Sequence, residues 1–298
     1  MTRDSKNSLV NWRSLLFIPA DKKKFIDSAA TRGADAIILD LEDSIPQSAK
    51  PAARAQLSKH IVTLHNQSLD VVVRINYDLI NAVADLDVAV STFTAAIMVP
   101  KVMGANHLRL LDDSITLLEQ QRGICTGTIK LIALIESIEG LENAKSIAMA
   151  TPRLMGLALG TEDLSLDGGF EPTPENLFFP AQKIVYAARL ANISVFGFPA
   201  SIADFSDIKQ FTVRQVKAKS MGFNGALCIH PTQVRPINEA HTPTEDEIVL
   251  ANKIVAAYKQ ALEEHSGVVQ IDGKMIDLPV VERAQRTLAS PFHINNKQ

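Results

Sequence analysis

Eight short apolar runs recur along the 298-residue chain, and longer amphipathic segments separate them. The runs are rich in Ile, Val and Leu, which is typical of strands buried on both faces of a parallel sheet. Alternating strands and helices imply right-handed βαβ units, and eight units fit a closed (β/α)8 TIM barrel, of the α/β class, better than an open doubly wound sheet. No Gly-x-Gly-x-x-Gly follows the first run, which argues against a dinucleotide-binding fold. The predicted strands cover residues 14–19, 36–43, 71–76, 95–101, 130–137, 154–163, 194–201 and 225–231.

The chain continues well beyond the eighth run. Residues 1–240 are therefore assigned to the barrel, and residues 241–298 to a C-terminal extension too short to form an independent domain. We expect the extension to cap the barrel and a neighbouring subunit. It should contain a helix with Thr242 as its N-cap, Pro243 in its first turn and its end near Glu264, a hairpin that turns at Asp272-Gly273, and a last helix over residues 278–289.

The composition is that of a globular protein, with 46% hydrophobic and 21% charged residues. A net charge of −3 predicts no attraction to nucleic acid or to an anionic membrane. The sequence has no signal-peptide pattern and no apolar stretch long enough to span a membrane. Two cysteines, Cys125 and Cys228, do not suggest a disulfide framework. These features favour the cytoplasm.

Polar residues end most of the runs, at the barrel face where enzymes of this fold place their chemistry. Glu136 and Asp163 end consecutive runs, so they should be neighbours. Carboxylate oxygens are the ligands that Mg²⁺ prefers, and one or two carboxylates suffice. Glu42 and Asp43 end the second run and could orient metal-bound water. The alternative for each carboxylate is an ion pair at the rim with Arg74 or Lys101.

Arg74 ends the third run, where a buried guanidinium needs an anion. That anion could be a substrate carboxylate, or it could be Glu42 or Asp43. His230 precedes a proline and is interpreted as structural, and Cys228 as core packing. Lys101 is the one candidate for a Schiff base, and no Ser/His/Asp or Cys/His nucleophilic set stands out.

An ordered set of motifs extends this interpretation. It consists of RSLLFIPAD, AIILDLEDSI, VVVRIN, IMVPKV, LIALIES, LALGTEDLS, GFNGALCIHPTQV, TPTEDE and DGKMIDLPVVERA. From Arg13 to Ala289 the chain resembles the citrate lyase β-subunit-like family of the HpcH/HpaI aldolase superfamily, which includes malyl-CoA and citramalyl-CoA lyases. The resemblance implies a barrel with a C-terminal extension, a homotrimer or hexamer, and Mg²⁺-dependent cleavage of CoA thioesters that releases 2-keto acids.

The resemblance also implies roles for individual residues, carried over motif by motif. Glu136 and Asp163 match magnesium ligands. Arg74 matches the arginine that binds the keto-acid carboxylate. Glu42 and Asp43 match the acidic pair near the metal-bound waters. Asp277 matches an acid/base residue that reaches a neighbouring subunit's site, and Phe17 and Lys22 lie where the family contacts the CoA nucleotide.

Some positions depart from the family pattern. Ala20 replaces the usual Gly after Pro19, and Ser28 stands where many members have Lys. Residues 197–199 replace a usual aspartate with an apolar stretch, which favours pyruvate over glyoxylate, and hence citramalyl-CoA over malyl-CoA. The sequence CIHP at residues 228–231 favours a free-standing lyase. The alternatives are a citryl-carrier lyase β subunit, a malyl-CoA thioesterase, or a non-catalytic binding barrel.

Overall fold

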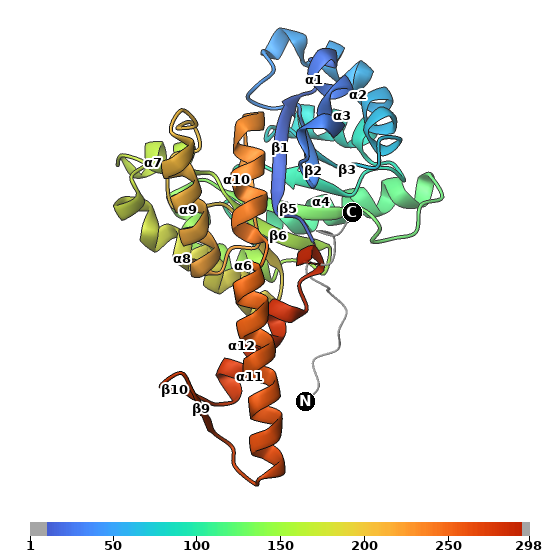
Figure 1. Ribbon diagram of the computed structural model, residues 1–298. Coiled ribbons are helices and arrows are strands. Elements are labelled where there is room, and N and C mark those ends of the chain that lie inside the picture. Colours follow the sequence, from blue (N-terminus) through green and yellow to red (C-terminus); the bar gives the residue numbers. More distant parts are fainter. Residues whose placement is uncertain (1–10, 294–298) are drawn as a thin grey trace. The chain divides into compact units, whose positions relative to one another are not determined.

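Eight parallel strands form one sheet that curls into a barrel in the computed structural model of this protein, which describes residues 11–293 (Figure 1). Each of the first six strands pairs with the strand that follows it along the chain, and the first also pairs with the eighth. The predicted (β/α)8 fold is confirmed. The strands are β1 (Ser14–Pro19), β2 (Ala36–Asp40), β3 (Asp70–Arg74), β4 (Ala96–Val99), β5 (Lys130–Ile135), β6 (Leu154–Leu159), β7 (Ser194–Phe196) and β8 (Ala226–Cys228).

The barrel closes between β7 and the residues just before β8. Phe196 forms a parallel bridge with Gly225. The Gly197 N–H donates to the Gly225 carbonyl at 2.9 Å, and the Asn224 N–H donates to the Val195 carbonyl at 2.9 Å. A Cβ at Gly225 would lie 2.2 Å from the Arg13 carbonyl oxygen, so only glycine lets the backbones approach this closely.

Helices connect the strands and surround them (Figure 1). The expected single helix after β5 is interrupted at Asn143 and becomes two short helices. The helices of the barrel are α1 (Lys23–Asp27), α2 (Lys50–His65), α3 (Leu79–Ala89), α4 (Ala105–Gln121), α5 (Ile138–Glu142), α6 (Ala144–Ala148), α7 (Thr161–Gly168), α8 (Pro174–Ala191), α9 (Ile208–Met221) and α10 (Pro231–His241), with 3₁₀ turns at Ala29–Arg32 and Gln47–Ala49.

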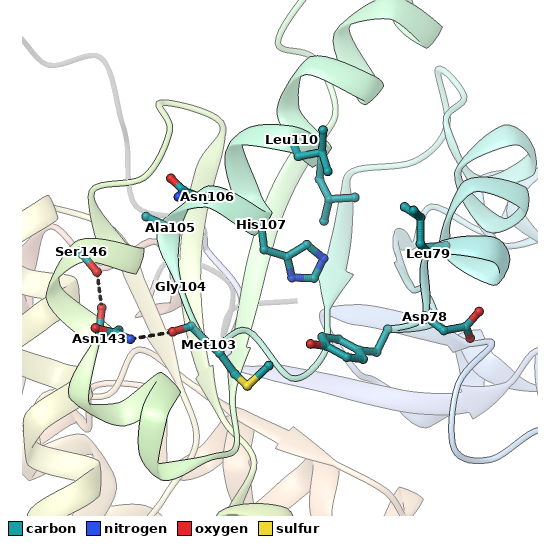
Figure 2. A pocket seen from close by; sticks show the side chains of 13 residues that line it. Asp78, Leu79, Met103, Gly104, Ala105, Asn106, His107, Leu110, Asn143 and Ser146 are labelled. Atoms are coloured by element: carbon teal, nitrogen blue, oxygen red, sulfur yellow. Dashed lines mark hydrogen bonds between the residues drawn. The ribbon is translucent and has the colours of Figure 1, made fainter.

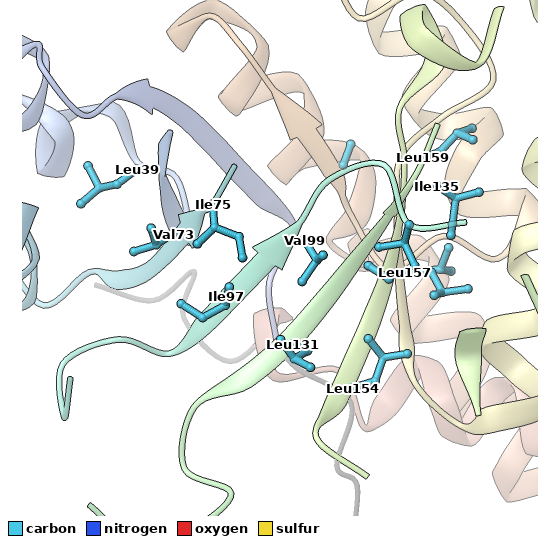
Figure 3. Close-up of a cluster of buried hydrophobic side chains, with 14 of the residues drawn as sticks. Leu39, Val73, Ile75, Ile97, Val99, Leu131, Ile135, Leu154, Leu157 and Leu159 are labelled. Atoms are coloured by element: carbon cyan, nitrogen blue, oxygen red, sulfur yellow. The ribbon is translucent and has the colours of Figure 1, made fainter. Parts of the chain in front are cut away.

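Two apolar clusters explain why the strands are hydrophobic on both faces. Ile38, Val72, Met98, Ile132 and Leu134 belong to a cluster in the barrel interior. Alternate side chains of the same strands belong to a larger cluster against the helices, part of which is shown in Figure 3. Full burial of one such side chain stabilises the folded state by roughly 1.5–3 kcal/mol. Burial in both clusters therefore favours a closed sheet with both faces covered.

Several predicted strands extend too far at their C-terminal ends. The sixth ends at Leu159 rather than at residue 163, the seventh at Phe196 rather than at 201, and the eighth at Cys228 rather than at 231. Polar and turn-forming residues at the barrel rim leave the sheet there and begin loops or helices. Asp163 is consequently a helix residue of α7 and not a strand residue.

The chain divides into two units, one ending at His241 and the other beginning at Thr242. The second unit contains α11 (Glu245–Glu263), the antiparallel strands β9 (Val269–Ile271) and β10 (Lys274–Ile276), and α12 (Leu278–Leu288). The predicted helix–hairpin–helix is present, and the hairpin turns at Asp272 and Gly273, both with positive φ.

The predicted cap of the first helix in this unit is wrong. Thr244, not Thr242, is the N-cap of α11, and Pro243 precedes the helix. The Thr244 hydroxyl accepts from the Glu247 N–H at 3.1 Å, and Glu247 accepts from the Thr244 N–H at 2.9 Å. This reciprocal capping box satisfies two backbone donors, which explains why the helix begins at Glu245.

Cys125 is exposed and Cys228 is buried, and both are free thiols. Burial raises the pKa of the Cys228 thiol, in agreement with its interpretation as core packing. Within residues 11–293, no helix combines the length and the apolar character that a membrane span requires.

Candidate active site

A cavity of about 460 Å³ opens at the C-terminal ends of the barrel strands. Its wall combines charged side chains with apolar ones, as expected of a small-molecule site. Arg74, Asp43, Glu136 and Asp163 line it together, so the structure places these four predicted site residues around one space. The other lining residues are Phe17, Pro19, Asp40, Ser44, Leu134, Leu159, Gly160, Thr161, Glu162, Ile202, Leu227 and Ile229.

Arg74, at the end of β3, is held by a carboxylate that the sequence analysis did not single out. Its Nε and Nη2 donate to the two oxygens of Asp40, each at 2.7 Å. Asp40 is 2% exposed and also accepts from the backbone N–H groups of Glu42 and Ser44. Burial alone would raise the pKa of Asp40, but the hydrogen bonds and charge of Arg74 hold it below its usual value. The planar guanidinium is therefore fixed, with Nη1 as its remaining terminal nitrogen.

Asp40 could have been found from the strand register. It lies opposite Arg74 in the pairing of β2 with β3, and both residues end their strands. When the runs AIILD and DVVVR are aligned side by side with their C-terminal ends together, Asp40 lies opposite Arg74. Glu42 and Asp43, the internal partners predicted for Arg74, lie further along the chain than this register position.

Glu42 lies between two cations. Its Oε1 accepts from Lys101 Nζ at 2.7 Å, and its Oε2 is 3.0 Å from Arg74 Nη1. Within residues 11–293, Oε2 is buried and accepts no hydrogen bond. Burial raises the pKa of Glu42, and the charges of Arg74 and Lys101 only partly offset that effect. Asp43 is more exposed, at 3.5 Å from Lys101 and 3.9 Å from Arg74.

Glu136 follows β5 and is 4% exposed. Its Oε1 accepts from the Lys101 backbone N–H at 2.6 Å. A Cβ at Gly160 would lie 2.7 Å from Glu136 Oε2, so the glycine leaves room for this carboxylate. Burial, together with the negative charges of Glu42 and Asp163, raises the pKa of Glu136 to about 8. The hydrogen bond from the Lys101 N–H and the charge of Arg74 offset this rise only in part.

Lys101 does not have the properties of a Schiff-base lysine. Its backbone is left-handed, with φ 51°, as expected of the turn beside Pro100. Burial by itself lowers the pKa of its ammonium, but the hydrogen bond and charge of Glu42 raise it to about 12. An amine nucleophile requires the opposite shift, so Lys101 acts as a fixed cation beside the acidic residues.

These residues fit a magnesium ion. Glu136 is buried, Gly160 leaves room beside its Oε2, and Asp163 supplies a second carboxylate on the same cavity. Among the described residues, no group of three or more His, Cys, Asp or Glu side chains is arranged to hold a metal. Mg²⁺ commonly binds through one or two carboxylates and leaves other positions to water and substrate. The donor set therefore suits magnesium better than a metal that needs a complete protein cage.

Phe17 and Lys22 are placed differently from each other. The Phe17 ring lies beneath the Arg74 guanidinium, with 4.9 Å from Cζ to the ring centroid. It lines the site cavity and also a second groove of about 470 Å³ that contains Phe25, Ser28, Arg32 and His230. Lys22 precedes α1, is exposed, and forms an ion pair with Asp21 at 2.8 Å. It is not part of either lining.

Asp277 belongs to the second unit. It is the N-cap of α12, where its side chain accepts from the Val280 N–H at 3.3 Å. This contact gives Asp277 a local structural role. Its predicted acid/base role in a neighbouring subunit remains a prediction.

The expected apolar wall at residues 197–199 is wrong in detail. Phe198 is 2% exposed and packs edge-on against Phe211 at 5.3 Å. None of residues 197–199 lines the cavity, and Ile202 of the same loop lines it instead. Glycine at 197 adopts φ 140°, which turns the chain at the end of β7. His230 stacks on Phe205 at 4.7 Å, in agreement with its structural interpretation.

A larger cavity of about 570 Å³ lies among the residues that follow β3, β4 and β5 (Figure 2). Two of its polar side chains already have partners: Asn143 donates to the Met103 carbonyl at 2.8 Å, and Asp78 caps α3. The His107 ring meets Tyr77 edge-on at 5.7 Å. Because this cavity contains neither Arg74 nor the acidic cluster, the smaller cavity is the candidate active site.

The chain is similar to known proteins over nearly its whole length. Citrate lyase subunit beta of Leuconostoc mesenteroides subsp. cremoris is 34% identical over 287 residues, covering 95% of this chain and 94% of that one. The (3S)-malyl-CoA thioesterase of Cereibacter sphaeroides is 32% identical over 281 residues, covering 93% and 94%. The crystal structure of CitE from Mycobacterium tuberculosis in complex with magnesium, acetoacetate and coenzyme A superposes with a TM-score of 0.73 at 27% identity, covering 94% and 97%.

The resemblance inferred from the motifs is confirmed by a family model. The model described as HpcH/HpaI aldolase/citrate lyase matches residues 13–231, which include all eight barrel strands. The chain belongs to the HpcH/HpaI aldolase/citrate lyase family.

Proposed function

We propose that this protein is a Mg²⁺-dependent lyase that cleaves a 3-hydroxyacyl-CoA thioester by retro-aldol chemistry, with citramalyl-CoA as the substrate and acetyl-CoA and pyruvate as the products. One observation carries the proposal: an immobilised arginine lines one cavity together with the buried Glu136 and with Asp163. Arg74 can receive a substrate carboxylate, and Glu136 and Asp163 can hold the metal. Related CitE structures contain magnesium with pyruvate, or with acetoacetate and coenzyme A.

Bound magnesium would act as a Lewis acid towards the substrate's 3-hydroxyl and adjacent carboxylate. Arg74 would orient that carboxylate through Nη1, because Asp40 occupies Nε and Nη2. Substrate binding would then compete with the contact between Arg74 and Glu42. Glu42 and Asp43 would accept hydrogen bonds from water near the metal ligands.

The thioester part needs its own path to the site. The groove that shares Phe17, Pro19 and Ile229 with the site cavity offers one, and Phe25 and Arg32 supply an aromatic face and a cation for a nucleotide. Arg32 Nη2 lies 3.3 Å from the Ser28 hydroxyl, so a cation is retained near the position where many relatives have lysine. We assign this groove to coenzyme A, with Phe17 at its inner end and Lys22 as a further phosphate contact.

The enolate of acetyl-CoA must be protonated after cleavage. We assign this step to Asp277 of a neighbouring subunit in a homotrimer or hexamer, with the extension capping that subunit's barrel. The protein would work in the cytoplasm.

Two alternatives are each favoured by one comparison. Citrate lyase subunit beta is 34% identical over 95% of this chain, which favours a lyase subunit that acts on a carrier-bound citryl thioester. Identity to (3S)-malyl-CoA thioesterase favours hydrolysis of the thioester bond. The three reactions release different products, so one assay can separate them.

The test is a panel of citramalyl-, malyl-, β-methylmalyl- and citryl-CoA and a carrier-bound citryl thioester, with keto acid and free thiol measured with and without Mg²⁺. The proposal expects pyruvate release from citramalyl-CoA without free thiol, and loss of turnover with a chelator. Thiol release without keto acid would establish the thioesterase instead. Activity confined to a carrier-bound citryl thioester would establish the lyase subunit.

A further inference from the structure

The loop between β7 and α9 contributes one side chain, Ile202, to the site cavity. Both backbone polar groups of Ile202 are held by side chains from other elements. Its N–H donates to Glu162 Oε1 at 3.2 Å, and its carbonyl accepts from Gln233 Nε2 at 3.0 Å. The position of Ile202 is thus tied to α7 and to α10.

Further contacts make this attachment rigid. Gln233 is completely buried, and its Oε1 accepts from the backbone N–H groups of Ile229 and His230. Phe205, three residues after Ile202, stacks on the His230 ring. Phe198, four residues before it, is buried against Phe211 of α9. A side chain held from both sides in this way can act as a fixed wall.

The two kinds of lining divide the cavity chemically. The metal ligands and Arg74 would bind the carboxylate and carbonyl of a 2-keto acid, which leaves its alkyl substituent for the apolar lining. Leu134 and Leu227 belong to the barrel interior and are only 2% and 3% exposed, so they form part of the scaffold. Ile202 is half-buried on a loop that belongs to no strand, so its size can vary without altering the barrel.

We propose that Ile202 is a specificity-determining residue that limits the size of the keto acid's alkyl substituent at about one methyl group and disfavours a carboxymethyl group. The inference rests on the proposed function. Pyruvate fits this wall, whereas a longer alkyl chain meets the Ile202 side chain. Arg74 is the one cation among the described lining residues and would already hold the keto acid's own carboxylate, so the carboxylate of a carboxymethyl group would be desolvated against Ile202 without a partner.

The test measures the affinities of glyoxylate, pyruvate, 2-oxobutyrate and oxaloacetate for the full chain with Mg²⁺ by calorimetry. We expect Ile202→Ala to raise the affinity ratio of 2-oxobutyrate to pyruvate by roughly tenfold or more, since one methylene is worth about 10–200-fold in such pockets. Ile202→Val should shift the ratio in the same direction by less. Ile208→Ala makes the same truncation at the start of α9, outside the cavity lining, and should leave the ratio unchanged.

The outcomes separate the two proposals. If the wild-type protein binds keto acids but neither Ile202 variant changes the ratio, the role of Ile202 is overturned and the proposed function stands. If the wild-type protein binds none of the keto acids, the proposed function fails, and the role of Ile202 fails with it. Tightest binding of oxaloacetate by the wild-type protein would also overturn the inference.

Discussion

Two buried charge clusters lie in the barrel unit, one around Arg153 at the start of β6 and one around Arg74 at the end of β3. Arg153 Nη1 and Nη2 donate to the two oxygens of Glu119, each at 2.9 Å, and its Nε donates to Asp112 at 2.7 Å. The same carboxylate of Glu119 accepts from the N–H groups of Gly127 and Ile129. Every strong donor in this cluster meets an acceptor.

The buried glutamates of the two clusters have pKa values shifted in opposite directions, whereas the pKa of Asp40, which is bound to Arg74, is lowered like those of the acids around Arg153. Burial alone would raise the pKa of Glu119 and Asp112, but the hydrogen bonds and charge of Arg153 hold both below their usual values. In the cluster around Arg74, the pKa values of Glu42 and Glu136 are raised. A complete cluster stabilises the fold, whereas an incomplete one leaves charge that a ligand can compensate. The raised pKa values belong to acids beside the cavity that Arg74 lines, which supports placing the site there.

The largest expected effect comes from removing charge at the incomplete cluster. Glu136→Gln should lower turnover by roughly a thousandfold, because loss of several kcal/mol of charge stabilisation by the metal corresponds to about three powers of ten in rate. The chelator-treated variant should be at least as stable as the wild-type protein, since a buried carboxylate is removed. Steady-state kinetics and urea unfolding measure the two effects.

Glu139→Gln is the matched control, because Glu139 lies three residues further on, is exposed, and is absent from the cavity lining. Glu139→Gln should change neither the turnover nor the stability measured by urea unfolding. Unchanged turnover in Glu136→Gln would instead show that the reaction does not depend on Glu136 as a metal ligand.

The complete cluster should respond in the opposite way. Arg153→Met leaves Glu119 buried without its cation, which should cost about 3–5 kcal/mol of unfolding free energy. Turnover of the folded variant at low temperature should stay near the wild-type value. The double variant Arg153→Met/Glu119→Gln should recover part of the loss, because the unpaired charge is gone. A double variant no more stable than the single one would contradict this account of the cluster.

The pH dependence of stability should separate the clusters next. Glu119 and Asp112 have lowered pKa values in the folded state, so their stabilisation is present above their unfolded pKa values and is lost as pH falls through the folded ones. Glu136 behaves oppositely: the folded state retains its proton up to about pH 8, so stability decreases as pH rises from about 4.5 to about 8. Urea unfolding with a chelator should show this alkaline decrease in the wild-type protein. A decrease of the same size in Glu136→Gln would assign it to another group.

The sequence predicted the scaffold more completely than the site. Apolar runs identified all eight strands because both sheet faces are buried, but strand ends depend on where rim residues leave the ladder. Asp163 was therefore placed on a strand although it lies in the first turn of α7. Asp40 was missed because its importance comes from strand register, and Ile202 because it depends on how a loop is held. The contacts of Asp40 and Ile202 join residues about 30 or more positions apart in the sequence. A pattern within one strand or helix carries no information about them.

The smallest effect expected here concerns the one part of the Arg74 cluster that is complete. Asp40→Asn removes the negative charge and one of the two acceptors that fix the guanidinium, so Arg74 can turn further towards Glu42. Hydrogen bonds to charged groups are worth about 1.5–3 kcal/mol, so we expect KM to rise roughly tenfold, with a smaller change in kcat. Asp43→Asn is the control for lost charge alone, because Asp43 lies 3.9 Å from Arg74, too far for a hydrogen bond, and is more exposed than Asp40. Equal KM changes in both variants would show that Asp40 acts through its charge and not by positioning Arg74.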